Sequence, residues 1–197
     1  MTVDLAVLLG CFAAVALVFV YTLVTGSPPT PTSPRVRRAM MHLLPRHLPI
    51  RSDGKTGKVY ELGAGWGGNV IALAKTYPEA EIVGIERSPL PWLFSRLRLI
   101  GQRRENASFE LGDFTAQPLS DASLVVCYLS GPQMAVLADK LADELTPGTL
   151  VMTHTFAIPD WRPVDTVQAD DMYRSPIYLY EVPTGSGAVA DASHSTV

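Results

Sequence analysis

The fold of this chain is decided by residues 60–70, YELGAGWGGNV, in which Gly63, Gly65 and Gly68 have the spacing GxGxxG. Apolar residues precede these glycines at strand-like spacing, and a helical pattern follows them. Glycine lets the backbone of a tight turn approach a ligand closely, because it has no side chain to clash and accepts positive φ. The stretch therefore predicts a nucleotide-type ligand site after a first strand.

Strand and helix patterns alternate on the C-terminal side of this turn. We expect strands at 58–62, 81–85, 107–111, 123–129 and 149–156, and helices at 69–77, 88–101 and 132–145. The helix at 88–101 has an apolar stripe that includes Leu93, Phe94, Leu97 and Ile100. This alternation predicts an α/β fold, a Rossmann-like doubly wound and mainly parallel sheet. The extended segments 164–169 and 177–182 have no helix between them and are expected to close it as a C-terminal antiparallel hairpin.

The N-terminal region predicts a membrane anchor. Residues 5–24 carry no charge, and as a helix rising ~1.5 Å per residue they would cover about 30 Å, the hydrocarbon thickness of a bilayer. No Lys or Arg precedes the run and no A-x-A-like site follows it, so one transmembrane helix in 1–24 is favoured over a cleaved signal peptide. Arginines begin at Arg35, which predicts a single-pass membrane protein whose domain faces the cytoplasm.

Composition divides the remainder of the chain. Residues 25–34 contain four prolines and predict a semi-rigid linker. Residues 35–57 mix arginines with apolar residues, which predicts a basic amphipathic lead-in that either contacts anionic lipid or presents a solvated face. The α/β domain is expected to cover 58–182. Residues 183–197 have almost no large apolar side chain and are expected to be disordered.

Overall charge and cysteine content narrow the function. The net charge of the 197 residues is −3, which gives no indication of a nucleic-acid partner. The two cysteines, Cys11 in the N-terminal apolar run and Cys127 in a strand-like segment, form neither a disulfide framework nor a metal-ligand cluster. We therefore expect no metal.

Three acidic residues distinguish between possible ligands. Glu86 ends the second strand, where an acidic side chain accepts hydrogen bonds from ribose hydroxyls in many nucleotide cofactors. Glu61 precedes the glycines, where a carboxylate would oppose a pyrophosphate but would complement the sulfonium and ammonium of S-adenosylmethionine. Asp113 follows the third strand and is placed to accept a hydrogen bond from an adenine amino group. These residues favour S-adenosylmethionine over NAD.

The segments 61–67, Glu86, 112–114 and 145–151 together resemble the class I, seven-strand S-adenosylmethionine-dependent methyltransferases. The predicted anchor and the segments 85–89 and 156–163 make the chain most similar to the small membrane-anchored protein lysine methyltransferases, which include those acting on the ATP synthase c subunit and the adenine nucleotide translocase. The resemblance implies that S-adenosyl-L-methionine is held by residues in three places. Its methionine end would meet Glu61, Gly63, Gly65 and Gly67, its ribose Glu86, and its adenine Asp113.

The methyl acceptor is less well defined by the sequence. The family's fourth strand commonly ends in an acidic or amide residue followed by prolines, whereas this chain has Tyr128-Leu129-Ser130-Gly131-Pro132. We expect Tyr128 and Ser130 to orient the acceptor amine. Trp66 is expected beside the cofactor, and Trp161 either walls a substrate channel or plugs the core.

The predicted activity is methylation of a lysine side chain of a membrane or membrane-associated protein, without nucleic acid or metal. Two alternatives remain open at this point. The GxGxxG spacing and Glu86 also fit an NAD-dependent oxidoreductase. The unusual loop at 128–132 also fits a non-catalytic membrane-tethered protein that binds a nucleotide-like ligand.

Overall fold

The computed structural model describes residues 2–25, 30–51, 54–102 and 104–183. The helices are α1 Thr2–Thr25, α2 Pro34–Leu43, α3 Gly68–Thr76, α4 Pro89–Gln102 and α5 Gly131–Glu144, with a short 3-10 helix η1 at Phe114–Ala116. The strands are β1 Lys58–Leu62, β2 Ile82–Glu86, β3 Ala107–Leu111, β4 Ala122–Cys127, β5 Leu150–His154, β6 Asp165–Gln168 and β7 Pro176–Glu181. Disorder was expected at 183–197, and residues 184–197 lie outside the described residues.

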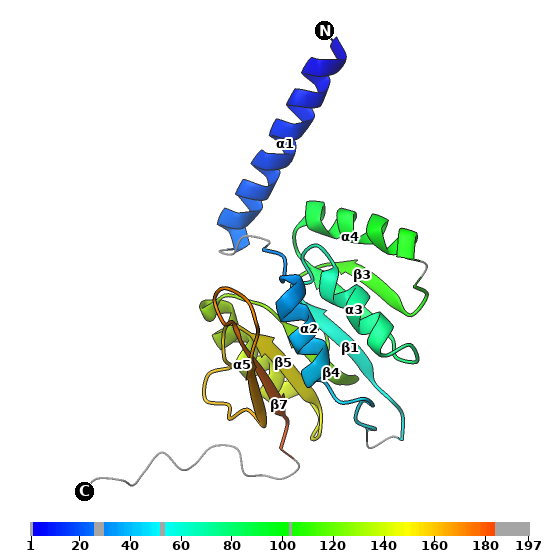
Figure 1. Cartoon of the computed structure of the whole chain (residues 1–197), viewed down its shortest axis with the longest axis vertical. Helices are drawn as coiled ribbons and strands as arrows, with labels where there is room; N and C mark the ends of the chain where they lie inside the picture. Colours follow the sequence, from blue (N-terminus) through cyan, green and yellow to red (C-terminus); the bar gives the residue numbers. More distant parts are fainter. Residues whose placement is uncertain (1, 26–29, 52–53, 103, 184–197) are drawn as a thin grey trace, which may run out of the picture.

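Within the described residues the seven strands form one sheet, in the order β3-β2-β1-β4-β5-β7-β6 (Figure 1). The first five strands in this order are parallel, whereas β7 runs antiparallel to both β5 and β6. The mainly parallel sheet and its C-terminal antiparallel hairpin are therefore confirmed. The chain moves outward from β1 through β2 to β3 and then returns to β4 on the other side of β1, so the strand order reverses between β1 and β4.

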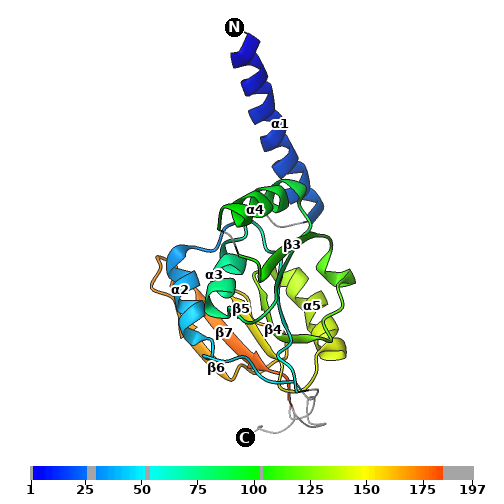
Figure 2. The same ribbon diagram turned by 90° about the vertical axis from the view of Figure 1, so that its right-hand side faces the viewer.

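Helices cover both faces of the sheet, as Figure 2 shows with α2 and α3 on one side and α5 on the other. Two clusters of buried apolar residues fill the two layers, one containing Met40 and Leu73 and the other containing Leu137 and Leu141. Helix α2 begins at Ser33, whose Oγ accepts a hydrogen bond of 3.2 Å from Val36 N. Because Val36 and Met40 are buried in the first cluster, the apolar face of the lead-in packs against the domain.

Helix α4 presents its apolar stripe to solvent, which the sequence pattern did not predict. Leu93 and Phe94 are each 48% exposed, and Leu97 and Ile100 are 61% and 74% exposed. The buried side of α4 instead carries Ser95, whose Oγ donates a 2.8 Å hydrogen bond to Gly65 O. A small side chain lets the helix lie close to the glycine turn, so proximity to that turn decides which side of α4 faces inward.

Helix α1 forms where the anchor was predicted and projects away from the domain (Figures 1 and 2). Across the part of the chain that the structure describes, no helix has both the length and the apolar character needed to cross a membrane. The transmembrane span predicted within residues 1–24, and the orientation inferred from it, stay predictions.

Candidate active site

A cavity of about 380 Å³ opens at the carboxyl ends of β1, β2 and β4. This volume falls in the range of small-molecule sites, and the position is where ligands bind in open parallel sheets, at the reversal of strand order. The walls come from the turns after β1, β2, β3 and β4 and from a segment that precedes α2. The topology thus gathers the residues predicted from separate motifs at one edge of the sheet.

The glycine turn has the backbone conformation that its sequence requires. Gly63, Gly65 and Gly67 have φ of 74°, 51° and 73°, values that residues with side chains rarely adopt. Gly63 and Gly65 line the cavity. A Cβ on Gly67 would instead lie 2.6 Å from Phe109 Cζ. Gly67 is therefore needed for packing beneath the turn, and the structure places it outside the lining where the sequence predicted a contact with cofactor.

Glu61 provides a buried carboxylate at one end of the cavity. The residue is 3% exposed, and its Oε1 accepts a 2.7 Å hydrogen bond from Asn69 Nδ2. Its Oε2 is buried and has no hydrogen-bond partner among the described residues. Burial raises the pKa of Glu61 to about 8, against the opposing influence of Asn69, the backbone N–H of Val70 and Arg37. Because an unpartnered buried carboxylate oxygen is costly, a cationic ligand group would fit this position.

Glu86 lies at the end of β2 and is 7% exposed. Its Oε2 accepts a hydrogen bond of 2.7 Å from Gly65 N, and its Oε1 accepts one of 2.7 Å from Ser88 N. A carboxylate has about four acceptor positions, so both oxygens can accept further hydrogen bonds. Glu86 therefore fixes the glycine turn relative to β2 and retains the capacity to bind hydroxyl groups in the cavity.

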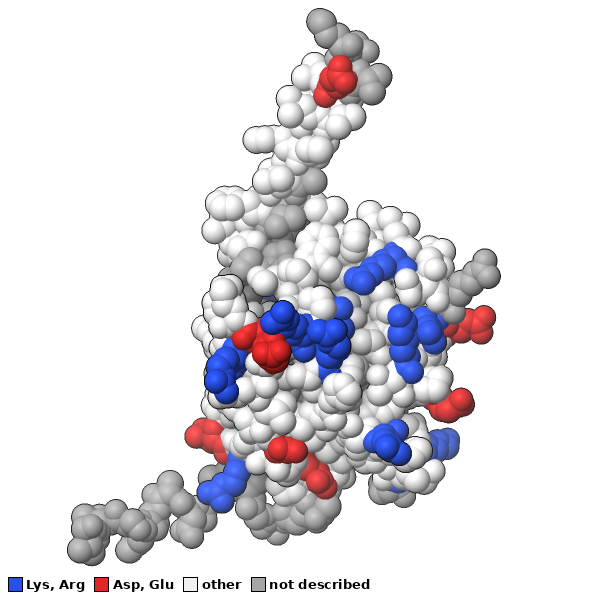
Figure 3. All heavy atoms as spheres, viewed as in Figure 1, with Lys and Arg blue, Asp and Glu red and all other residues white. Residues whose placement is uncertain are grey.

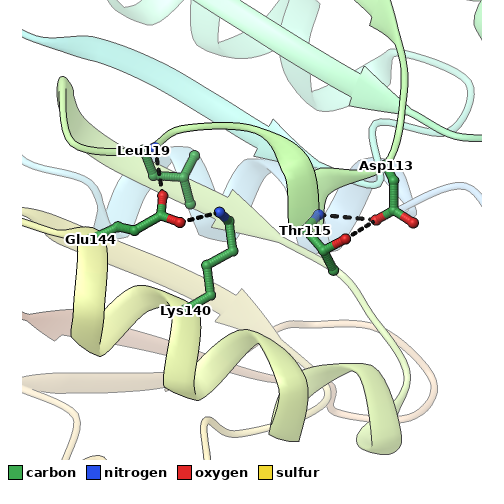
Figure 4. Close-up of polar contacts among 5 residues, drawn as sticks. All are labelled: Asp113, Thr115, Leu119, Lys140 and Glu144. Carbon is green, nitrogen blue, oxygen red and sulfur yellow. Dashed lines mark hydrogen bonds and ion pairs between the residues drawn. The ribbon is translucent and has the colours of Figure 1, made fainter.

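Asp113 lines the cavity and also organises the turn after β3 (Figure 4). Its Oδ1 accepts hydrogen bonds from Thr115 N at 3.0 Å and from Thr115 Oγ1 at 2.8 Å, and its Oδ2 lies 3.4 Å from Arg87 Nη1. The hydrogen bond from Thr115 N is the main reason that the pKa of Asp113 lies below its ordinary value. The same loop is also held to the end of α5, where Leu119 N donates a 2.9 Å hydrogen bond to Glu144 Oε2 (Figure 4).

Aromatic side chains form much of the remaining wall. Trp66 lines the cavity and packs edge-on against Phe94, with ring centroids 5.4 Å apart. Tyr128 lines it from the end of β4 and stacks on His154, with centroids 3.9 Å apart. Phe156 also lines it and is 40% exposed, so this ring lies between the cavity and the solvent.

Ser130 and Trp161 have structural roles in the fold. Ser130 lines the cavity, but its Oγ donates a 2.8 Å hydrogen bond to Gln133 Oε1 at the start of α5, so the hydroxyl helps to begin that helix. Trp161 does not line the cavity. It packs into the second core cluster, edge-on to Tyr180 with centroids 6.1 Å apart. Of its two predicted roles, the structure places Trp161 in the core.

Comparison with known proteins identifies the class of this site. The family described as the ANTKMT methyltransferase domain matches residues 61–165. The chain is 30% identical over 162 residues to a protein-lysine N-methyltransferase of Saccharolobus islandicus, which covers 79% of this chain and 93% of that protein. The chain belongs to this methyltransferase family. The chain shares its fold with class I methyltransferases.

Two further relatives extend the comparison. The adenine nucleotide translocase lysine N-methyltransferase of Mus musculus is 30% identical over 117 residues, which cover 58% of this chain and half of the mouse protein. The crystal structure of an RNA methyltransferase from Salinibacter ruber, in complex with S-adenosyl-L-homocysteine, superposes with a TM-score of 0.68 at 28% identity. That match covers 82% of this chain and 99% of the other.

This methyltransferase is an S-adenosylmethionine-dependent enzyme, as its family and its cofactor-bound structural relative show. The prediction of enzyme class and cofactor is confirmed, and neither the NAD-dependent oxidoreductase nor the non-catalytic binding protein is supported. The cavity fits the cofactor, because the buried Oε2 of Glu61 has no partner among the described residues and can accept a hydrogen bond from the cationic end of such a ligand. Across the described residues, no group of three or more His, Cys, Asp and Glu side chains could hold a metal ion.

The chemistry requires little from the protein beyond placement. When bound, S-adenosylmethionine would supply a methyl group attached to a positively charged sulfur, and that sulfur would leave as a neutral thioether as the methyl group passes to a nucleophile in line with the C–S bond. The chain's contribution is to fix both reactants in that geometry and to exclude water. His154 is a weak base because burial lowers its pKa to about 4. Its stacking against Tyr128 makes His154 a support for the wall.

Several lining residues were not predicted from the sequence. Asn69, Arg37, Phe156 and the residues Thr30–Thr32 all contribute to the cavity. Asn69 carried a detectable signal, since it is a polar residue on the buried face of the helix that begins at the glycine turn. Thr32 carried none, because it lies 122 residues from His154 in sequence and yet the two side chains are 3.1 Å apart.

Proposed function

We propose that this enzyme methylates the side-chain amine of lysine residues in a membrane or membrane-associated protein. The observation that carries the proposal is the aromatic wall of the cavity, which consists of the partly buried Tyr128 and of Phe156, 40% exposed to the solvent. Such rings can contact the methylene chain of a lysine while its amine reaches the methyl group. The names of the archaeal and mouse relatives, both lysine methyltransferases, support the same acceptor.

The amine must be neutral to act as a nucleophile. A lysine has an unperturbed pKa of about 10.4, and His154, which stacks on Tyr128, is a weak base because burial lowers its pKa to about 4. We therefore propose that water accepts the proton that the acceptor lysine loses. The methylation rate should rise with pH over the range in which the protein remains folded, because the neutral fraction of the acceptor rises.

Support for a membrane-associated substrate comes from the apolar surface near α1 and α4. These helices contact each other, and both expose large apolar side chains, such as Leu8 at 65%, Phe12 at 72% and Ile100 at 74%. On the face seen in Figure 3, basic side chains gather over α2 while the projecting α1 carries none. An exposed apolar surface of this kind is unusual on a protein that meets only water.

The activity is tested by incubating the full chain and S-adenosylmethionine with membrane-protein extracts, and locating added methyl groups by tandem mass spectrometry. Methyl groups on lysine side chains are the expected result. Replacing the identified lysine with arginine should abolish the signal, since the guanidinium remains protonated. Methyl groups found only on RNA in a parallel incubation would contradict the proposal and would instead match the Salinibacter relative.

The membrane part has its own test, co-sedimentation of the full chain with vesicles of anionic phospholipid. We expect the parent to sediment with the vesicles and the double variant Leu97→Glu, Ile100→Glu to remain largely in solution. Val136→Glu on α5 is the matched control, because Val136 is 57% exposed on another helix. Equal sedimentation of all three proteins would contradict a role for α4.

A further inference from the structure

The segment Thr30–Thr32, which the sequence predicts to be part of a spacer, lines the cofactor cavity. It directly precedes α2 and lines the cavity together with the turns that follow the strands. Thr32 O accepts a 2.7 Å hydrogen bond from Arg37 Nη2, one turn into α2. The segment is therefore tied to the domain beside the cofactor site.

The side chain of Thr32 makes two further hydrogen bonds. Its Oγ1 lies 3.1 Å from Asn69 Nδ2 and 3.1 Å from His154 Nε2. Since an amide N–H can only donate, Asn69 donates to Thr32, and the hydroxyl proton is left to donate to the neutral imidazole of His154. His154 Nδ1 lies 3.2 Å from Thr155 Oγ1, so its ring proton also has a partner. The hydroxyl hydrogen of Thr32 and the ring hydrogen of His154 then both have an acceptor.

The same amide group of Asn69 holds Glu61. Asn69 Nδ2 donates its second proton to Glu61 Oε1 at 2.7 Å, and Asn69 Oδ1 accepts a 3.0 Å hydrogen bond from Arg37 Nε. Thr32 and Arg37 therefore fix the rotation of the Asn69 amide, which in turn fixes the carboxylate of Glu61. The oxygen left free by this arrangement is the buried, unpartnered Glu61 Oε2.

We propose that Thr32 is a positioning residue for the amino-acid end of S-adenosylmethionine, acting through Asn69 on Glu61. The segment before α2 is then a part of the active site and not only a spacer. The inference rests on the assignment of Glu61 to the amino-acid end of the cofactor and is independent of the identity of the methyl acceptor.

The test compares two ligands on the full chain by calorimetric titration. S-adenosylhomocysteine carries the amino-acid end, whereas 5′-methylthioadenosine lacks it and should not sense Glu61. In Thr32→Val, which removes the hydroxyl and keeps the shape, Kd for S-adenosylhomocysteine should rise about tenfold, while Kd for 5′-methylthioadenosine should change less than about twofold. Thr32→Ser should restore the parent value, and Glu61→Gln should reproduce the pattern of Thr32→Val.

Thr166→Val is the matched control, because Thr166 is an exposed residue of β6 that does not line the cavity. It should leave both dissociation constants unchanged. Equal weakening of both ligands by Thr32→Val would indicate a general structural effect and would overturn the proposal. Unchanged binding of S-adenosylhomocysteine in Thr32→Val, or an unchanged value in Glu61→Gln, would overturn it as well.

Discussion

Glu61 is the residue at which burial and charge are most clearly in conflict. Its carboxyl group is 3% exposed, one oxygen is held by Asn69, and the other has no partner in the described part of the chain. In a protein selected only for stability, such a position would favour an apolar side chain. The conflict is resolved if a cation completes the site, which is what the sequence pattern around the glycines had indicated.

The protonation of Glu61 predicts how cofactor affinity depends on pH. Burial raises its pKa to about 8, so at pH 7 the carboxyl group of the free protein is mainly protonated. A ligand ammonium favours the ionised form, so binding releases a proton. Titration of the parent with S-adenosylhomocysteine should show affinity rising by up to about tenfold per pH unit toward pH 8 and levelling off there. Glu61→Gln should bind more weakly, and its affinity should not rise with pH. If its affinity rises with the same slope as that of the parent, the released proton comes from a group other than Glu61.

Gly67 provides a second prediction at the scale of one residue. Its φ is 73°, and an added Cβ would lie 2.6 Å from Phe109 Cζ. Gly67→Ala should therefore lower the free energy of unfolding by more than about 1 kcal/mol in urea titrations. Gly101→Ala is the matched control in α4, with no atom within 4 Å of the added carbon, and it should stabilise by about 0.5–1 kcal/mol. If both variants have a lower free energy of unfolding than the parent, close packing around Gly67 is not the cause of the destabilisation.

At the scale of elements, the sheet strands and the positions of their helices follow from local sequence, whereas the inward side of a helix does not. The strand β3 forms at the expected residues because apolar and polar positions alternate within it, and β1 forms at the expected residues as a short buried run that leads into the glycine turn. The apolar stripe of α4 points outward, because the small Ser95 is what fits against the glycine turn. Which face of a helix is buried depends on the element that it packs against, and the sequence of the helix alone does not identify that element.

Helix α2 is an element whose contribution can be measured. Met40 is fully buried in the first core cluster, so Met40→Ala should lower the free energy of unfolding by about 2–5 kcal/mol, seen as an earlier midpoint in urea. Met172→Ala is the matched control, because Met172 is 84% exposed. Equal midpoints for the two variants would show that α2 does not share the core of the domain.

At the scale of the whole molecule, the sheet brings separate motifs to one edge, and this explains which site residues could be predicted. Glu61, Glu86 and Asp113 lie within two residues of the C-terminal end of a strand, so the topology predicts that they meet. Thr32 lines the same cavity and contacts His154, a long-range contact with no local signature. The projecting α1 was predicted as a helix from its apolar run, but the membrane span was not found in the described residues.

The central claim, a cavity built by Glu61 and Glu86 for S-adenosylmethionine, is tested most directly by calorimetric titration of the full chain. S-adenosylhomocysteine should bind and NAD should not, and Glu86→Ala should weaken binding about tenfold through lost hydrogen bonds. Glu79→Ala, at an exposed residue away from the cavity, should leave the affinity unchanged. Binding of NAD with no response to S-adenosylhomocysteine, or equal affinities in the parent and Glu86→Ala, would contradict the account.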